Sequence, residues 1–410
     1  MSQAYPSDEE IKNTLKKRHS DSRVWRGIFY LSTVAAIVIL VILVMSIVNQ
    51  AFGLVVVEDT VPPSALSSVP LEQTSSADLI AILKKNLSNN RYKTINKELP
   101  FTARSQEELV GLVIAEVVTP AVIDSYHLDE SFLKRDEIIQ NASEKHPNSR
   151  VEFKAWINPQ FITRSMSSTP ELAGVRTAIF GSLWIILITI FTAFPIGVGA
   201  AIYLEEYAEV NRINRIIQTN IDNLAGVPSI IYGILGLAIF VRGIGFFTSG
   251  GFLGGGETSG RTILSAGLTM ALLILPILII NAQEAIRAVP KSLREASYGL
   301  GATKWQTIWH HVLPSALPGI LTGTILAISR AIGETAPLIL VGASSFINKD
   351  PSGLFSRFTA LPIQIYNWTT RPQVEFRNIA AAAILVLLVL LLSLNAFAIL
   401  MRNRFTRRIS

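Results

Sequence analysis

The chain has 410 residues, of which 50% are hydrophobic and only 16% are charged. Because charged residues make up about a quarter of an ordinary soluble protein, this composition indicates a polytopic membrane protein. The absence of cysteine excludes disulfides, thiolate chemistry and cysteine-ligated metals. Basic loops beside membrane helices explain the net charge of +6, and no concentrated basic and aromatic surface points to nucleic acid.

Residues 1–27 are polar and basic, and Ser7 with Glu10 predicts a short capped helix there. A long uncharged run follows, so we predict a first transmembrane helix over residues 28–53. This run is longer than the core of a signal peptide, which favours a retained anchor. The basic residues before it predict that the N-terminus stays in the cytoplasm.

Residues 54–172 differ in kind, because charged residues return at ordinary density. Capping patterns that begin at Ser75, Ser105 and Asp129 predict helices over residues 76–88, 106–118 and 129–144. We therefore expect a small, mostly helical insert. Since the first transmembrane helix starts in the cytoplasm, the insert is expected on the outside, and the sequence assigns no role to it.

Five further uncharged runs occur within residues 173–402 and, with the first, predict six transmembrane helices in an all-α membrane protein. They lie between Arg176 and Glu205, Asp222 and Arg242, Arg261 and Glu284, Lys304 and Arg330, and Arg377 and Arg402, and the fourth continues past Glu334 to about Ala343. An even number of spans places both termini on one side. The basic tail 403–410 agrees with a cytoplasmic C-terminus.

The loop 287–314 falls on the cytoplasmic side by this count, and its pattern predicts two short helices joined by a turn at Gly301. Thr303 with Gln306 predicts a capping box at the start of the second helix. Trp305, Ile308 and Trp309 follow a spacing typical of one helix face. On physical grounds alone, this apolar face either docks on a partner or lies on the membrane surface.

Five residues of the same loop form a pattern with defined spacing along the chain: Glu295, Ala296, Gly301, Leu313 and Pro314. Their spacing resembles the EAA loop of the permease subunits of ABC importers. Two positions depart from that pattern, because Ser297 stands where a second alanine is usual and His311 where isoleucine is usual. The resemblance implies that this loop is the coupling element that docks on a separate ATPase subunit.

Arg330 and Glu334 form a charged pair inside the fifth predicted span. Their i, i+4 spacing puts both on one helix face, where they can neutralise each other. One interpretation is a structural ion pair that fixes helix packing. The other is a substrate path, in which Arg330 offers its guanidinium fork to a passing oxyanion while Glu334 holds the fork in place.

The segment 330–337 reads RAIGETAP and resembles the corresponding segment of phosphate-specific ABC importers. Together with residues 203–207, 223–230 and 299–323, it makes the region 173–402 similar to the PstA type of permease. The resemblance implies a type I ABC importer permease fold and import of inorganic phosphate across the cytoplasmic (inner) membrane of a bacterium or archaeon. The insert before Glu171 is not part of this resemblance.

The resemblance also implies the partners: a second homologous permease subunit, two ATPase subunits and an extracytoplasmic phosphate-binding protein, besides membrane lipid. The glycine-rich stretch 250–260 lacks the GK[ST] ending of a phosphate-binding P-loop, so ATP hydrolysis is expected in a separate subunit. We expect no catalytic residues, no cofactor and no metal site in this chain.

Two alternatives stay open. The first is a permease for another oxyanion or small solute, since only the RAIGETAP segment specifies phosphate. The second is a membrane-anchored sensor in which the insert binds a ligand. The EAA spacing and the lack of a cytoplasmic output domain argue against the sensor.

Overall fold

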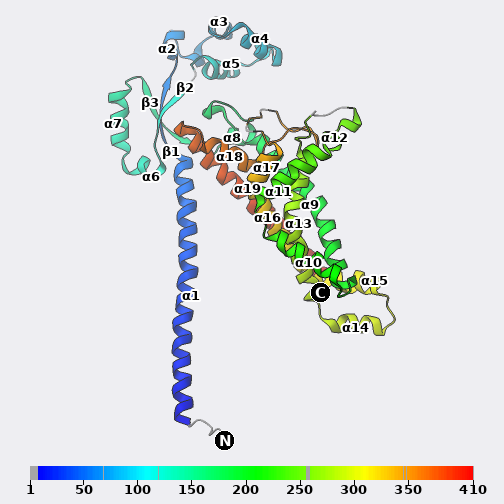
Figure 1. Cartoon of the computed structure of the whole chain (residues 1–410). Helices are drawn as coiled ribbons and strands as arrows, with labels where there is room; N and C mark the ends of the chain where they lie inside the picture. The colour runs from blue at the N-terminus through cyan, green and yellow to red at the C-terminus, as the bar shows by residue number, and fades with distance from the viewer. Residues whose placement is uncertain are drawn as a thin grey trace, which may run out of the picture.

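The computed structural model describes residues 8–67, 69–118, 120–254, 259–344, 346–347 and 349–409. Figure 1 shows three parts: a bundle of helices, a long separate helix α1, and a small sheet with its own helices that lies between the α18 end of the bundle and the end of α1. The hairpin of α14 and α15 lies at the opposite end of the bundle from the sheet.

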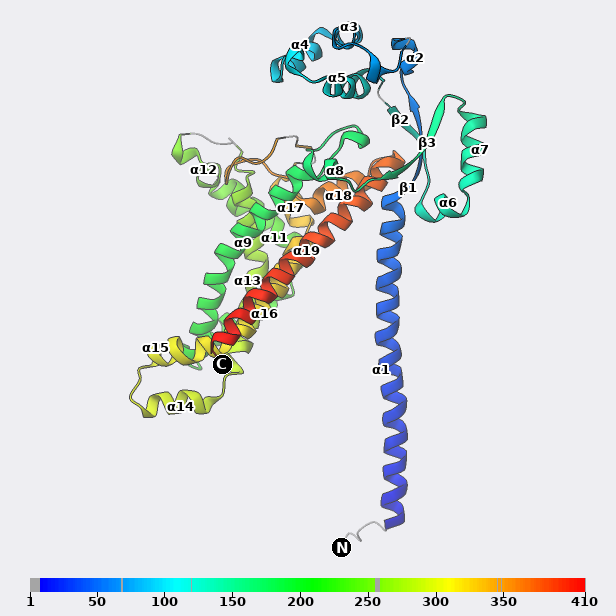
Figure 2. The same cartoon turned by 180° about the vertical axis from the view of Figure 1, so that it is seen from behind.

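Helix α1 (Asp8–Ala51) is one continuous helix, whereas the sequence predicted a short helix followed by a separate span. No proline interrupts these residues, so nothing breaks the hydrogen-bond ladder. The predicted cap Ser7 lies outside the described residues. Side chains from residue 21 to residue 43 are exposed where described, and α1 stands clear of the bundle along most of its length in both views (Figures 1 and 2).

The sheet has the strand order β2-β1-β3, with both pairs antiparallel. Its strands are β1 (Phe52–Asp59), β2 (Pro120–Ser125) and β3 (Ser149–Ala155). The sequence analysis did not predict this sheet. The apolar residues of β1 follow the first transmembrane run without a charge between them, and the three strands are far apart in sequence, so local periodicity does not reveal their pairing.

The predicted helices of the insert are confirmed. They appear as α3 (Ser76–Asn86), as α5 (Gln106–Val113) continued by the π-helical turn η3 (Ile114–Val118), and as α6 (Leu128–Leu133) and α7 (Arg135–Lys145). Ser75 and Ser105 cap α3 and α5 as predicted. The short helices α2 (Pro63–Leu66), α4 (Asn89–Glu98) and α8 (Pro159–Thr163) complete the insert. Leu79, Leu83 and Leu109 lie at the centre of a separate apolar core of α3, α4 and α5.

The bundle is built around α13 (Ile263–Arg287), which packs against α9 (Arg176–Ile202) and α16 (Leu313–Gly333). The remaining helices are α10 (Arg212–Ala225), α11 (Ser229–Gly236), α12 (Gly245–Thr248), α17 (Ala336–Val341), α18 (Leu361–Thr369) and α19 (Val374–Ile409). Gly267 lies against Ile188 of α9, and Gly323 of α16 lies against Asn281. Small residues at such crossings let membrane helices approach closely.

Among the described residues, five helices are long and apolar enough to cross a membrane, and a bent pair makes a sixth if it counts as one span. The pair consists of α10 and the helix from Ser229 to Gly243, and it bends by 107°. The break precedes Pro228, which has no N–H to continue the α10 ladder. The fifth predicted span also differs from the expectation, since α16 ends at Gly333 and the chain resumes as α17.

The sheet is packed on the last two helices of the bundle. Trp156, next to β3, shares one buried cluster with Trp368 of α18 and Phe376 of α19. The amide of Asn378 on α19 also donates a hydrogen bond to the Ser125 hydroxyl of β2 over 2.6 Å. The sheet is therefore tied to the last membrane helix by both apolar and polar contacts.

Candidate functional site

The predicted cytoplasmic loop folds as a helical hairpin, which we call the hairpin and define as residues 291–312. It consists of α14 (Lys291–Gly299), α15 (Lys304–Thr307) and the π-helical turn η8 (Ile308–Val312). Gly301 has a φ of +83°, a left-handed conformation that glycine adopts without a steric penalty, so the predicted glycine turn is confirmed. The predicted capping box of Thr303 and Gln306 is also present.

Two tryptophans form part of the exposed apolar surface of the hairpin. Trp305 and Trp309 are 58% and 53% exposed, and their rings stack with centroids 5.5 Å apart. Ile308 is only 1% exposed, so the prediction that it shares this surface is wrong. Its buried side chain leaves no surface for contact with a partner.

The five residues of the EAA pattern divide into an exposed set and a half-buried set. Glu295, Ala296 and Gly301 are exposed, whereas Leu313 and Pro314 are half-buried where α16 begins. The departure at Ser297 has a physical explanation. Its hydroxyl is buried and shares a 2.9 Å hydrogen bond with the hydroxyl of Thr307, so it links α14 to α15 in a way that alanine cannot.

A buried ion pair anchors the hairpin to the bundle. Glu206 lies in the π-helical turn η5 (Tyr203–Tyr207), and its carboxylate accepts hydrogen bonds of 2.7 and 3.0 Å from the guanidinium of Arg294 on α14. The two side chains are 6% and 16% exposed. Arg294 also donates to the carbonyl oxygens of Ile286 and Val289 at the end of α13. One guanidinium thus joins η5, α13 and α14.

The sequence analysis included the stretch 203–207 in the family resemblance but did not predict this contact. Two adjacent glutamates at the end of an apolar run were the available signal, since such charges need partners. Their partners come from residues more than 80 positions later, at 287 and 294, so only the folded chain identifies them.

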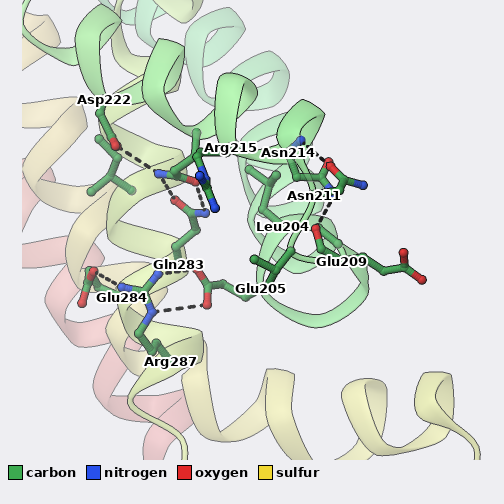
Figure 3. Close-up of a pocket in the computed structure, with 14 residues that line it drawn as sticks. Leu204, Glu205, Glu209, Asn211, Asn214, Arg215, Asp222, Gln283, Glu284 and Arg287 are labelled. Carbon is green, nitrogen blue, oxygen red and sulfur yellow. Dashed lines mark hydrogen bonds and ion pairs between the residues drawn. The ribbon is translucent and has the colours of Figure 1, made fainter.

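A cavity of about 470 Å³ lies beside this anchor, between η5, α10 and α13 (Figure 3). Figure 3 shows Glu205 and Arg287 pointing toward each other on one side of it, and their ion pair measures 2.6 Å. On another side, the buried Gln283 of α13 exchanges hydrogen bonds with Gln218 of α10. These amides and charges connect η5, α10 and α13 through polar contacts.

Arg330 and Glu334 do form the predicted ion pair, with 3.4 Å between Nε and Oε1. The geometry differs from two residues on one continuous helix, because Arg330 lies in the last turn of α16 and Glu334 follows the helix end in an extended conformation. Their side chains are 48% and 19% exposed. Since the contact uses Nε, the Nη groups of the fork remain able to bind an oxyanion.

A second cavity, of about 410 Å³, lies at the C-terminal end of α17 and has a positive lining that includes Arg261 and Arg357. Gly342 ends α17 with a φ of +110°, and its missing Cβ leaves room for the methylene groups of Arg261. The six residues of α17 span ~9 Å, so this cavity lies about one short helix away from the Glu334 end of the ion pair. No local sequence pattern predicts this cavity, because its lining comes from three separate segments.

The chain matches the family model described as "Binding-protein-dependent transport system inner membrane component" over residues 193–410. The probable ABC transporter permease protein YqgI of Bacillus subtilis is 34% identical over 251 residues, which cover 58% of this chain and 81% of that protein. The phosphate transport system permease protein PstA 1 of Mycobacterium tuberculosis is 37% identical over 237 residues, which cover 57% of this chain and 72% of that protein.

Among solved structures, a bacterial alginate ABC transporter in complex with alginate pentasaccharide-bound periplasmic protein is 17% identical, with a TM-score of 0.45, over 77% of this chain and 98% of that chain. The family match contains the hairpin and the pair of Arg330 and Glu334, whereas the insert 54–172 lies outside it. This chain therefore belongs to the family of binding-protein-dependent transport system inner membrane components and is a permease of an ABC transporter.

Proposed function

We propose that this chain is one of two homologous permease subunits of an ABC importer for inorganic phosphate. The observation that carries the proposal is the pair of Arg330 and Glu334 at the end of α16, within the RAIGETAP segment. The similarity to phosphate transport system permease proteins supports it. The protein itself performs no covalent chemistry, and ATP is hydrolysed by two separate ATPase subunits.

The chemistry of the pair suits phosphate. An arginine fork binds tetrahedral oxyanions through two parallel hydrogen bonds. A carboxylate beside that fork repels a fully deprotonated anion but accepts a hydrogen bond from an anion that still carries a proton. Phosphate is such an anion at neutral pH and sulfate is not. Glu334 therefore both holds Arg330 and favours phosphate over sulfate.

The second cavity, at the end of α17, extends the path of phosphate toward Arg330. Phosphate released by an extracytoplasmic binding protein first meets the positive charges of Arg261 and Arg357 and then moves along α17 to Arg330. Clefts lined by one sign of charge raise the local concentration of the opposite ion. This arrangement requires that the insert and the second cavity lie on the extracytoplasmic side of the membrane and that both termini lie in the cytoplasm.

The hairpin supplies the coupling to ATP. Trp305 and Trp309 dock on an ATPase subunit, since exposed stacked aromatic rings are typical anchors at protein interfaces. Movement of the hairpin reaches Arg330 through α16, which begins directly after η8 at Leu313. It also reaches α9 through the ion pair of Glu206 and Arg294.

Uptake of radiolabelled phosphate tests the proposal in a strain that lacks this gene and grows on limiting phosphate. Plasmid-borne wild-type protein restores uptake and growth, and Arg330→Gln does not. Competition with unlabelled arsenate, sulfate and molybdate identifies the preferred oxyanion. A preference for an anion other than phosphate would favour a permease for another oxyanion. If no ATPase subunit co-purifies with the solubilised protein, the importer proposal fails.

A further inference from the structure

The corner between α6 and α7 presents two large apolar side chains that no part of the described protein covers. Phe132 and Leu133 end α6 and are 76% and 84% exposed. Lys134 forms the corner, and Arg135 begins α7; both are exposed. We call residues 132–135 the α6 corner. Phe132 and Leu133 thus form a small exposed apolar surface directly beside two basic side chains.

The α6 corner is fixed to the end of the first membrane helix. The backbone N–H of Asp129 donates a 2.8 Å hydrogen bond to the side-chain oxygen of Asn49 on α1. The N–H of Leu54 on β1 donates a 2.7 Å hydrogen bond to the buried hydroxyl of Ser131 on α6. Both views show α6 beside the junction of α1 and β1 (Figures 1 and 2).

The length of α1 sets the depth of Asn49 in the membrane. The uncharged residues 27–48 extend ~33 Å at 1.5 Å per residue, which matches a hydrocarbon layer of roughly 30 Å. Asn49 and Gln50 are the polar residues that follow this run. Asn49 therefore lies at the edge of the hydrocarbon, on the side of the membrane where the insert lies.

Phe132 follows Asp129 by three residues, or ~4.5 Å of helix axis, whichever way α6 points. Interfacial helices bury their apolar face roughly 5–10 Å into the boundary between headgroups and acyl chains. The α6 corner therefore lies within this boundary layer.

We propose that the α6 corner inserts into the outer leaflet, with Phe132 and Leu133 among the upper acyl chains and Lys134 and Arg135 on phospholipid phosphates. Asp136 and Glu137 also begin α7, but α7 runs away from the end of α1 (Figures 1 and 2). Because every phospholipid carries a phosphate, insertion does not require an anionic lipid.

The corner gives the insert a third attachment, besides α1 and the packing on α19. It fixes the height and tilt at which the sheet and helices α3 to α5 are held above the membrane. The proposal for the α6 corner requires only that α1 crosses the membrane. It can therefore be tested in a complex that does not transport phosphate, independently of the proposed function.

The absence of cysteine in this chain allows a direct measurement. A nitroxide spin label on Leu133→Cys, in the assembled complex in phosphatidylcholine vesicles, reports its collision rates with oxygen and with a water-soluble nickel chelate. Oxygen concentrates in lipid and the chelate in water. Ile42→Cys on α1, 62% exposed, is the control inside the membrane, and Leu99→Cys, 41% exposed in the insert, is the control in water.

We expect the oxygen-to-nickel ratio of the Leu133 label to exceed that of the Leu99 label at least fivefold and to stay below that of the Ile42 label. Substituting Phe132→Ser in the same labelled protein lowers the ratio, because the second apolar anchor is lost. A Leu133 label with the ratio of the Leu99 label overturns the proposal. So does a Leu133 label that becomes immobile only when an extracytoplasmic binding protein is added, since the partner is then a protein.

Discussion

The ion pair of Glu206 and Arg294 allows the coupling between the hairpin and the membrane helices to be tested. Both side chains are nearly buried, and Arg294 is also bonded to the carbonyl oxygens of Ile286 and Val289. Glu206→Gln preserves the shape of the side chain and one acceptor but removes the negative charge. Arg294 keeps its carbonyl partners, so we expect a weakened anchor and a protein that still folds.

Removing one partner of a fully buried ion pair costs about 3–5 kcal/mol. A hydrogen bond to a charged group contributes about 1.5–3 kcal/mol, and glutamine retains part of that contact. We therefore expect a loss of about 2 kcal/mol in the anchored state of the hairpin, which corresponds to a change of about 30-fold in its equilibrium with a released state.

Hydrogen–deuterium exchange of the amides of α14 in the assembled complex measures this change. We expect exchange to accelerate about 30-fold in Glu206→Gln, and phosphate transported per ATP hydrolysed to fall in the same protein. Release of the hairpin disconnects ATP hydrolysis from the membrane helices without preventing docking on the ATPase.

The neighbouring glutamate provides a matched control. Glu205 pairs with Arg287, whose side chain is 59% exposed, and exposed pairs contribute about 0–1 kcal/mol. Glu205→Gln should therefore change exchange of α14 by less than about fivefold. Equal effects of the two substitutions, or wild-type exchange in Glu206→Gln, would refute the argument that burial makes this pair the anchor.

Three further predictions concern the turn and the charged pair. Gly301→Asp forces an L-residue into a left-handed turn, which costs about 1–2 kcal/mol, and it places a charge on the docking surface. Phosphate uptake should therefore fall at least tenfold while immunoblots show normal membrane levels of the protein, and normal uptake would contradict this prediction. Arg330→Gln should lower phosphate flux roughly 10- to 100-fold in a complex that still co-purifies, whereas unchanged flux would remove Arg330 from the path. Glu334→Gln should strengthen inhibition of phosphate uptake by sulfate, and an unchanged inhibition constant argues against a selective role for Glu334.

Local sequence patterns predicted the parts of the hairpin that depend on neighbouring residues. The turn at Gly301, the cap at Thr303 and the exposed tryptophans follow from backbone conformation and helix spacing, which are short-range properties. The prediction that Ile308 is exposed was wrong. The i, i+3 and i, i+4 pattern groups it with Trp305 and Trp309, although Ile308 and Trp309 lie about 100° apart around the helix axis. The side chain on the flank of that group is buried by the fold.

The contacts that join distant segments were not predictable in the same way. Glu206 pairs with Arg294, and Arg261 contacts Gly342, only after the membrane helices have packed. The sheet of the insert was missed for the same reason, since its three strands are separated by long helical segments and β1 resembles the end of a membrane helix.

By itself, the sequence determined which segments lie in the membrane, where the hairpin turns, and which charges must be neutralised inside the apolar layer, because hydrophobicity, capping and glycine conformation act over a few residues. Only the tertiary structure decided that Glu206 anchors the hairpin, that the charged pair straddles the end of α16, and that the α6 corner lies beside the end of α1. Each of these depends on distances between segments far apart in the chain, which packing sets and local composition does not.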